Sequence, residues 1–282
     1  MARRPVIRCF NEGRLRRQFD FLKSRFLQNV DLQFTDVLTS KIIAKALDEI
    51  EVVWNDRIYT PLVTLWVFLG QVLSADHSCR AAVARLLAHR VATKLRPCSS
   101  ETSAYCQARK RLPEKFFSTV ARDVGRALDN TTDRGWLWKG RSVYMFDGTT
   151  VTIPDTPENQ AAYPQLYNQK PGLGFPIARV CTMISLSRGA ILDMAICGYA
   201  GKGQGELSML HQLWHLLSTG DILLTDALMS TWRAMLMLKE RGVDSVSRFN
   251  KAHRRADFRR GKRLGKGDQI VRWPKPTLRN MD

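Results

Sequence analysis

The chain has 282 residues, of which 44% are hydrophobic and 25% charged, a composition typical of a globular protein with a sizeable core. Its formal net charge is +18 at pH 7. The sequence has no uncharged apolar run of roughly eighteen residues, and its N-terminal segment lacks the apolar core of a secretory signal. These features exclude a spanning helix and predict a cytoplasmic protein.

Positive charge is concentrated in two arms of the chain. Residues 1–25 hold eight Lys and Arg against two acids, residues 248–279 hold twelve against two, and the 222 residues between them sum to +3. Because each cation laid on a phosphate releases a condensed counterion, this distribution favours a nucleic acid partner. The alternative is a solvated tail that only maintains solubility.

The second arm supplies the candidate DNA-contacting residues, which are Lys251, Arg254, Arg255, Arg259, Arg260, Lys262 and Arg263. Aromatic residues lie in or beside both arms, where they could stack on bases or simply pack: Phe19, Phe26, Phe249, Phe258 and Trp273. This mixture of cations and aromatic rings favours nucleic acid over a purely solubilising role.

Apolar residues recur every three or four positions from about Arg14 to Asp129, which predicts an all-helical N-terminal part. The most apolar stretch, Pro61 to Leu73, predicts a buried helix that begins at the Thr60-Pro61 pair. Leu112-Pro113 marks a further helix boundary. We expect residues 1–135 to form a helical, DNA-binding region.

The periodicity changes after a junction at Trp136 to Arg141. Stretches rich in β-branched and aromatic residues predict three consecutive strands, over 142–154, 178–187 and 190–199. A helix, a short buried strand, a second helix and a last strand follow over 205–217, 221–229, 230–242 and 243–249. The order βββαβαβ predicts an α+β or α/β core with a mixed sheet over residues 136–249.

A Pro-rich segment, residues 154–176, separates the first two predicted strands. Its five prolines predict a long irregular loop that contains no regular element. Loops of this length in compact domains are usually functional. We therefore expect the segment to serve binding or catalysis rather than to add a structural element.

Two aspartates follow apolar strand segments and are candidate catalytic and metal-binding residues. Asp147 lies in MFDGTT at the expected exit of the first strand, and Asp226 lies in LLTDALMS at the end of the fourth. If these strands are neighbours, the carboxylates converge at one sheet edge, as metal-assisted phosphoryl transfer requires. Taken singly, each is better explained locally, Asp147 by a turn with Gly148 and Asp226 by a helix cap. Taken together, they favour a metal site.

Three other acidic residues have local explanations. Asp155 in the Pro-rich loop predicts a turn, and Asp193 is expected to face solvent from its strand. Glu206 begins a predicted helix, where its charge suits the helix dipole. None of the three is expected to take part in chemistry.

The segments FDGTTVTIPDTPENQAAYPQLYNQKPGLGFPIAR, GYAGKGQGE, GDILLTDALMS and DFRRGKRLGKGD resemble bacterial insertion-sequence transposases of the DDE type. The resemblance covers about residues 30–282 and is to the subgroup with the signature Tyr-x2-Arg-x3-Glu-x6-Lys. It implies a ribonuclease-H-like core in which Asp147 and Asp226 are the first two catalytic carboxylates. It also implies Mg²⁺ or Mn²⁺ as cofactor, double-stranded DNA of transposon ends as partner, and a DNA complex that can contain a homodimer.

The resemblance further implies that a β-rich insertion follows the fifth strand. Residues 250–282 match the start of that insertion, with a strand expected over Gln269 to Trp273. Trp273 itself is best explained by core packing.

The sequence departs from the family at the third carboxylate. After Asp226 the only glutamate is Glu240, and no tyrosine follows Asp226, so the signature is absent. We therefore expect a C-terminally truncated transposase, inactive or impaired because the third ligand is missing.

Three functional hypotheses follow from the sequence. The first is a transposase that carries out DNA transposition and recombination by metal-dependent strand cleavage and transfer. The second is a non-catalytic DNA-binding inhibitor derived from a transposase. The third, a metal-dependent nuclease without end specificity, fits the core but not the loop segments.

Overall fold

The computed structural model describes residues 37–50, 57–170, 172–249 and 258–275. The chain divides into two compact units, Met1–Leu128 and Asp129–Asp282. Across the described ranges, every helix is too short or too polar to cross a membrane.

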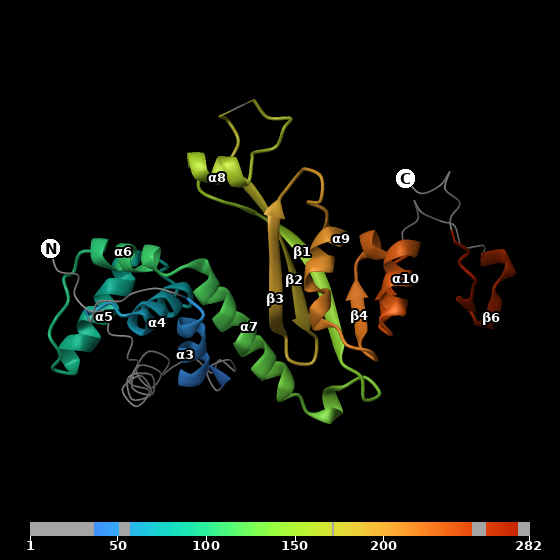
Figure 1. The fold of residues 1–282 in the computed structure, drawn as a ribbon, viewed down its shortest axis with the longest axis horizontal. Helices are drawn as coiled ribbons and strands as arrows, with labels where there is room; N and C mark the ends of the chain where they lie inside the picture. The colour runs from blue at the N-terminus through green and yellow to red at the C-terminus, as the bar shows by residue number, and fades with distance from the viewer. Residues whose placement is uncertain (1–36, 51–56, 171, 250–257, 276–282) are drawn as a thin grey trace. The chain divides into compact units, whose positions relative to one another are not determined.

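The described part of the first unit is helical, as the sequence predicts (Figure 1). The part of that prediction that falls on residues 1–36 and 51–56 lies outside the described residues. Its helices are α3 (Ser40–Asp48), α4 (Pro61–Val72), α5 (Cys79–Ala92), α6 (Ser103–Arg111) and α7 (Glu114–Asn130). Helix α4 begins as expected, because the Thr60 hydroxyl accepts a hydrogen bond from the Val63 N–H and Pro61 takes the first helical position. The break at Leu112-Pro113, between α6 and α7, is also confirmed.

The apolar run predicted to form a buried helix lies at the centre of this unit. Trp66 of α4 is fully buried and belongs to one core cluster with Ile43 of α3 and Phe116 of α7. A second cluster gathers around Val83 and Tyr105. The apolar area removed from water by these side chains is the main contribution to the stability of the helical unit.

The second unit contains a five-stranded mixed sheet with the order β3-β2-β1-β4-β5. The strands are β1 (Val143–Thr152), β2 (Ile177–Ser185), β3 (Ala190–Gly198), β4 (Ile222–Thr225) and β5 (Asp244–Ser247). β1, β2 and β3 form an antiparallel meander, whereas β4 pairs in parallel with both β1 and β5. The predicted βββαβαβ order and mixed α+β class are confirmed.

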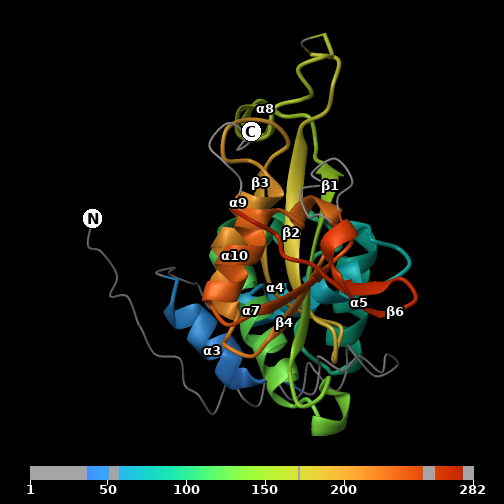
Figure 2. The ribbon, with the colours of Figure 1, turned by 90° about the vertical axis from the view of Figure 1, so that its right-hand side faces the viewer.

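Two helices cover one face of the sheet. α9 (Glu206–Leu213) packs against β2 and β3, and α10 (Trp232–Glu240) packs against β5 (Figure 2). Their buried side chains share one core cluster with Tyr144 and Phe146 of β1 and Leu223 of β4. Short 3-10 turns follow α9 at Trp214–Leu216 and β4 at Ala227–Met229.

The prediction that the Pro-rich segment contains no regular element is wrong. Residues Pro157–Ala162 form the helix α8, and the Thr156 hydroxyl accepts a hydrogen bond from the Asn159 N–H at 3.2 Å. Pro157 takes the first helical position, where its missing N–H costs nothing. The same Thr-Pro signal that marks the start of α4 was present here and outweighs the high proline content.

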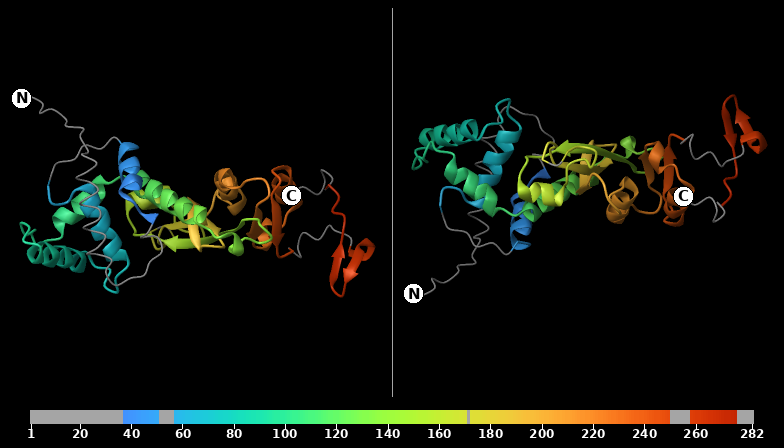
Figure 3. Two further views of the ribbon diagram at one scale, coloured as in Figure 1. Left: turned by 90° about the horizontal axis from the view of Figure 1, so that it is seen from below. Right: turned by 90° about the horizontal axis from the view of Figure 1, so that it is seen from above.

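A separate small hairpin lies in the second basic arm. Strands β6 (Lys262–Gly265) and β7 (Asp268–Ile270) pair with each other, in both views of Figure 3, and the 3-10 turn Phe258–Arg260 precedes them. The strand expected over Gln269 to Trp273 is therefore found three residues long and shifted toward the N-terminus.

The central position of β4 leads to a stability prediction. Leu223 is 0% exposed, so Leu223→Ala should lower the free energy of unfolding by about 2–5 kcal/mol through lost transfer energy and a residual cavity. Leu228→Ala is the matched control, because Leu228 is 60% exposed and its truncation should change stability by less than about 0.5 kcal/mol. Urea denaturation of both variants measures the difference, and equal losses would contradict the core assignment.

Candidate active site

The parallel pairing of β1 with β4 brings the two predicted catalytic aspartates together. Val143 pairs with Ile222 and Met145 with Leu224. Continued by two residues, this register places Asp147 opposite Asp226. Because neighbouring strands lie about 4.8 Å apart, the extended register puts the two aspartates at neighbouring positions of the sheet edge.

The sequence predicted that Asp147 ends its strand, but the structure places it in the middle. It is the fifth residue of the ten-residue strand β1, which continues to Thr152 while paired with β2 alone. Asp147 instead lies just beyond the point where pairing with β4 ends, since β4 stops at Thr225. The candidate site therefore lies at the carboxyl end of β4, the shorter of the two strands.

Each aspartate also makes the local contact expected of its sequence context. The Gly148 N–H donates to Oδ1 of Asp147 at 2.8 Å, and the Leu228 N–H donates to Oδ1 of Asp226 at 2.9 Å. Asp226 thereby caps the 3-10 turn after β4, while α10 has its own cap at Thr231. These bonds use one oxygen of each carboxylate and hold it in a defined orientation.

Both carboxylates are exposed to solvent. Desolvation therefore gives neither Asp147 nor Asp226 a reason to need a cation. The remaining argument for a metal site is the convergence of the two carboxylates. Two negative charges at adjacent positions repel each other, and a divalent cation relieves that repulsion.

Glu206 is a site residue that sequence reasoning missed. It is the first residue of α9, as predicted, but its carboxylate lies over the backbone next to Asp147. A Cβ atom on Gly148 would lie 3.4 Å from Oε1 of Glu206 and 2.8 Å from Sγ of Cys181. Burial raises the pKa of Glu206, and the negative charges of Asp226 and Asp147 raise it further, opposed by Arg179.

A topological signal could have identified Glu206. β1, β3 and β4 run in the same direction, because β2 is antiparallel to both β1 and β3, and β4 is parallel to β1. The carboxyl ends of the three strands therefore point to one edge of the sheet. A helix that follows β3 begins at that edge, so its first residue is close to the ends of β1 and β4.

Two further residues shape the electrostatics of this edge. Arg179 of β2 donates to the carbonyl oxygen of Gln204 at 2.8 Å, and its guanidinium lies over the Tyr199 ring. Burial raises the pKa of Cys181 to about 11, and the charges of Glu206 and Asp147 add to the shift. Cys181 therefore stays a neutral thiol at physiological pH and is a poor ligand for a soft metal.

The available donors fit a hard divalent cation. Asp147 and Asp226 each offer carboxylate oxygen, the ligand that Mg²⁺ and Mn²⁺ prefer, and a thiolate is not available. Over the ranges that the structure describes, no three His, Cys, Asp or Glu side chains are grouped closely enough to share one ion. Binding by more than two carboxylates would require a side chain to change rotamer.

Asp193 differs from its prediction. Its side chain is only 10% exposed and lies 3.9 Å from the His215 ring nitrogen, so it does not face solvent. Asp155 accepts a hydrogen bond from the Gln160 side chain at 2.8 Å, in keeping with a local role in the loop.

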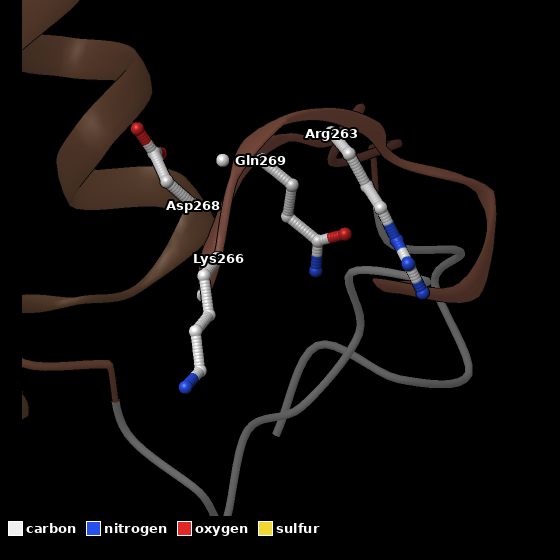
Figure 4. Close-up of a pocket in the computed structure, with 6 residues that line it drawn as sticks. Arg263, Lys266, Asp268 and Gln269 are labelled. Carbon is white, nitrogen blue, oxygen red and sulfur yellow. The ribbon is translucent and has the colours of Figure 1, made fainter.

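The β6–β7 hairpin presents part of the predicted DNA-contacting set. Arg259, Arg260, Lys262 and Arg263 are exposed, whereas Lys251, Arg254 and Arg255 lie outside the described residues. Beside the turn, Arg263, Lys266, Asp268 and Gln269 are among the residues that line a hollow of 360 Å³. In Figure 4 the Asp268 side chain points away from those of Arg263 and Gln269. Two cations and an amide around one hollow suit a phosphate group.

Trp273 is in contact with other aromatic residues. Its ring centroid lies 5.4 Å from that of Phe249, and its carbonyl oxygen accepts a hydrogen bond from the Trp232 indole at 3.2 Å. These contacts agree with the packing role expected from the sequence.

The proximity of Glu206 to Asp226 leads to a prediction about protonation. Asp226→Asn should lower the pKa of Glu206, because it removes the larger of the two repulsive charges, although burial continues to hold the value above 4.5. A raised folded-state pKa adds stability that is complete below the unfolded value and is lost as pH rises through the folded value. Asp226→Asn should bring the folded pKa of Glu206 closer to its unfolded value. It should therefore narrow the pH range between these two values, over which stability falls. Carboxyl NMR titration in chelator-containing buffer measures the pKa, and an unchanged value would contradict the geometry.

The chain resembles one curated protein in particular, and no protein-family model matches it. It is 28% identical over 268 residues to "Transposase InsG for insertion sequence element IS4" of Escherichia coli (strain K12). The match covers 89% of this chain and 56% of that protein, so the chain spans about half the length of the relative. The chain is therefore similar to an insertion-sequence transposase over most of its own length.

Proposed function

We propose that this chain functions in DNA transposition: it binds the DNA of transposon ends and cleaves DNA strands at a divalent-metal centre formed by Asp147 and Asp226. The observation that carries the proposal is the β1–β4 register, which aligns the two aspartates at one sheet edge. The similarity to an insertion-sequence transposase supports the same assignment.

Each aspartate would bind the metal through the oxygen that its backbone contact leaves free. The hydrogen bonds from the Gly148 and Leu228 N–H groups to Oδ1 fix the two carboxylate planes, which reduces the side-chain entropy lost on binding. When bound, Mg²⁺ or Mn²⁺ supplies Lewis-acid polarisation of the phosphate and a more acidic water. The role of the aspartates would be to hold the ion at this edge of the sheet.

Binding of DNA would depend on the exposed cations of the second basic arm. Arg263 and Lys266 line the hollow beside the hairpin turn and would contact phosphates rather than bases. Such contacts position the duplex but do not read its sequence, so specificity for transposon ends must come from other contacts.

The signature Tyr-x2-Arg-x3-Glu-x6-Lys does not occur in these 282 residues. The third carboxylate that the family resemblance implies is therefore not supplied from that motif. We expect metal-dependent nicking by this chain to be slow and complete excision to be inefficient.

Substitution of either aspartate tests the catalytic part of the proposal. Asp147→Asn and Asp226→Asn should each reduce Mg²⁺-dependent nicking of end-containing duplex on the order of 100-fold or more, because each removes a charged ligand. Binding of the same duplex should stay within about twofold, since neither residue belongs to the basic arm. Asp48→Asn, an exposed change at the end of α3, is the matched control.

Wild-type nicking rates in both aspartate variants would refute the assigned roles. Salt-dependent binding to transposon ends with no nicking by the unaltered chain would instead favour the non-catalytic DNA-binding inhibitor.

The contribution of the hairpin is tested by the salt dependence of DNA binding. Arg263→Gln should weaken binding to end-containing and random duplexes equally and reduce the slope of log K against log salt by about 1, because one phosphate contact is lost. Lys239→Gln, an exposed cation at the end of α10, should leave the slope unchanged. Fluorescence anisotropy over a series of salt concentrations measures both slopes, and equal slopes for wild type and Arg263→Gln would remove the hairpin from the interface.

A further inference from the structure

We propose that Glu206 is a third carboxylate ligand of the Asp147–Asp226 metal centre, supplied by the first turn of α9. This inference rests on the proposed function, because it adds a residue to the same centre. The family resemblance places its third carboxylate elsewhere, in a motif that this sequence lacks.

The fold fixes the position of Glu206 at the edge where the aspartates converge. Met209, Leu210 and Leu213 of α9 are buried in the core of the sheet unit, and Sδ of Met209 lies 3.2 Å from Sγ of Cys197 in β3. With the helix held in this way, its first residue cannot move away from the sheet. The backbone of Glu206 is thus preorganised beside β1.

The residue at position 148 leaves room for the Glu206 carboxylate. Since a Cβ there would lie 3.4 Å from Oε1 of Glu206, the carboxylate occupies space directly above the residue that follows Asp147. Any side chain at this position would also collide with Sγ of Cys181 at 2.8 Å. Glycine at 148 therefore permits the Glu206 carboxylate to lie directly against β1, beside the residue that follows Asp147.

The half-buried carboxylate of Glu206 lacks compensation from the protein. Its electrostatic neighbours are Asp226, Arg179 and Asp147, two of which are negative, and no hydrogen bond holds it in the ranges that the structure describes. A partly buried carboxylate without a partner is unfavourable, and a nearby divalent cation is a direct remedy. Arg179 is an incomplete substitute, because its guanidinium is engaged with the carbonyl oxygen of Gln204 and the Tyr199 ring.

Ligation by all three carboxylates requires a small rearrangement. The described side chains include no three such groups already close enough for one ion. Glutamate has three side-chain torsions, so Glu206 can reach toward Asp226 by a rotamer change without moving α9. The centre would then have three anionic oxygen ligands on three different elements, β1, α9 and the end of β4.

The test is Mn²⁺ binding by the full chain, measured by isothermal titration calorimetry and by the EPR signal of free Mn²⁺. Glu206→Gln should weaken Mn²⁺ binding on the order of 10- to 100-fold, as should Asp226→Asn. Glu240→Gln, an exposed glutamate at the end of α10, should bind Mn²⁺ as the wild type does. Thermal unfolding without added metal checks that each variant is folded.

A second condition separates ligation from a remote charge effect. At about 1 M salt the Debye length is about 3 Å, so a purely long-range contribution of Glu206 would be screened. We expect Glu206→Gln to bind Mn²⁺ more weakly than the wild type at this salt concentration as well. Equal affinities at high salt would overturn the proposal that Glu206 is a ligand.

The outcomes also separate this inference from the proposed function. If Asp147→Asn and Asp226→Asn lose Mn²⁺ binding but Glu206→Gln does not, the centre stands and Glu206 is not its ligand. If the wild-type chain binds no Mn²⁺, both the centre and the third ligand are refuted.

Discussion

Parallel pairing between β1 and β4 is the constraint on which the candidate site depends, because its register, continued by two residues, puts Asp147 opposite Asp226. Parallel strands cannot be joined by a tight turn, so the chain must cross over through a helix before β4 can form. That crossover contains α9, whose first residue is Glu206. One topological requirement therefore brings all three carboxylates to the same edge of the sheet.

The local and the chemical roles of the aspartates are compatible. The turn at Asp147 and the cap at Asp226 each use a single oxygen, and both bonds are to backbone N–H groups. A carboxylate held in this way is oriented before any ligand arrives, which lowers the entropic cost of binding. The structural explanation of each aspartate thus supports its proposed use.

Opposite charges are segregated within the second unit. The sheet edge carries Asp147, Asp226 and Glu206, whereas the hairpin hollow is lined by the cations Arg263 and Lys266 together with one acid, Asp268. Under the proposed function, the edge would hold the ion and the hairpin would hold the polyanion. The same segregation explains why a chain of high positive charge can retain an acidic edge.

The sequence by itself determined the helices of the described N-terminal part and the βββαβαβ order, because periodicity is a local property. It also singled out the two aspartates as candidates from their strand-end context. Even α8 was locally encoded at Thr156-Pro157, although the high proline content obscured it. Only the tertiary structure decided that Asp147 lies in mid-strand beyond the end of its pairing with β4, that the Asp193 side chain is largely shielded from solvent, and that the Glu206 carboxylate lies against β1 beside Gly148. These facts depend on strand register and helix docking, which arise from contacts between residues far apart in the chain.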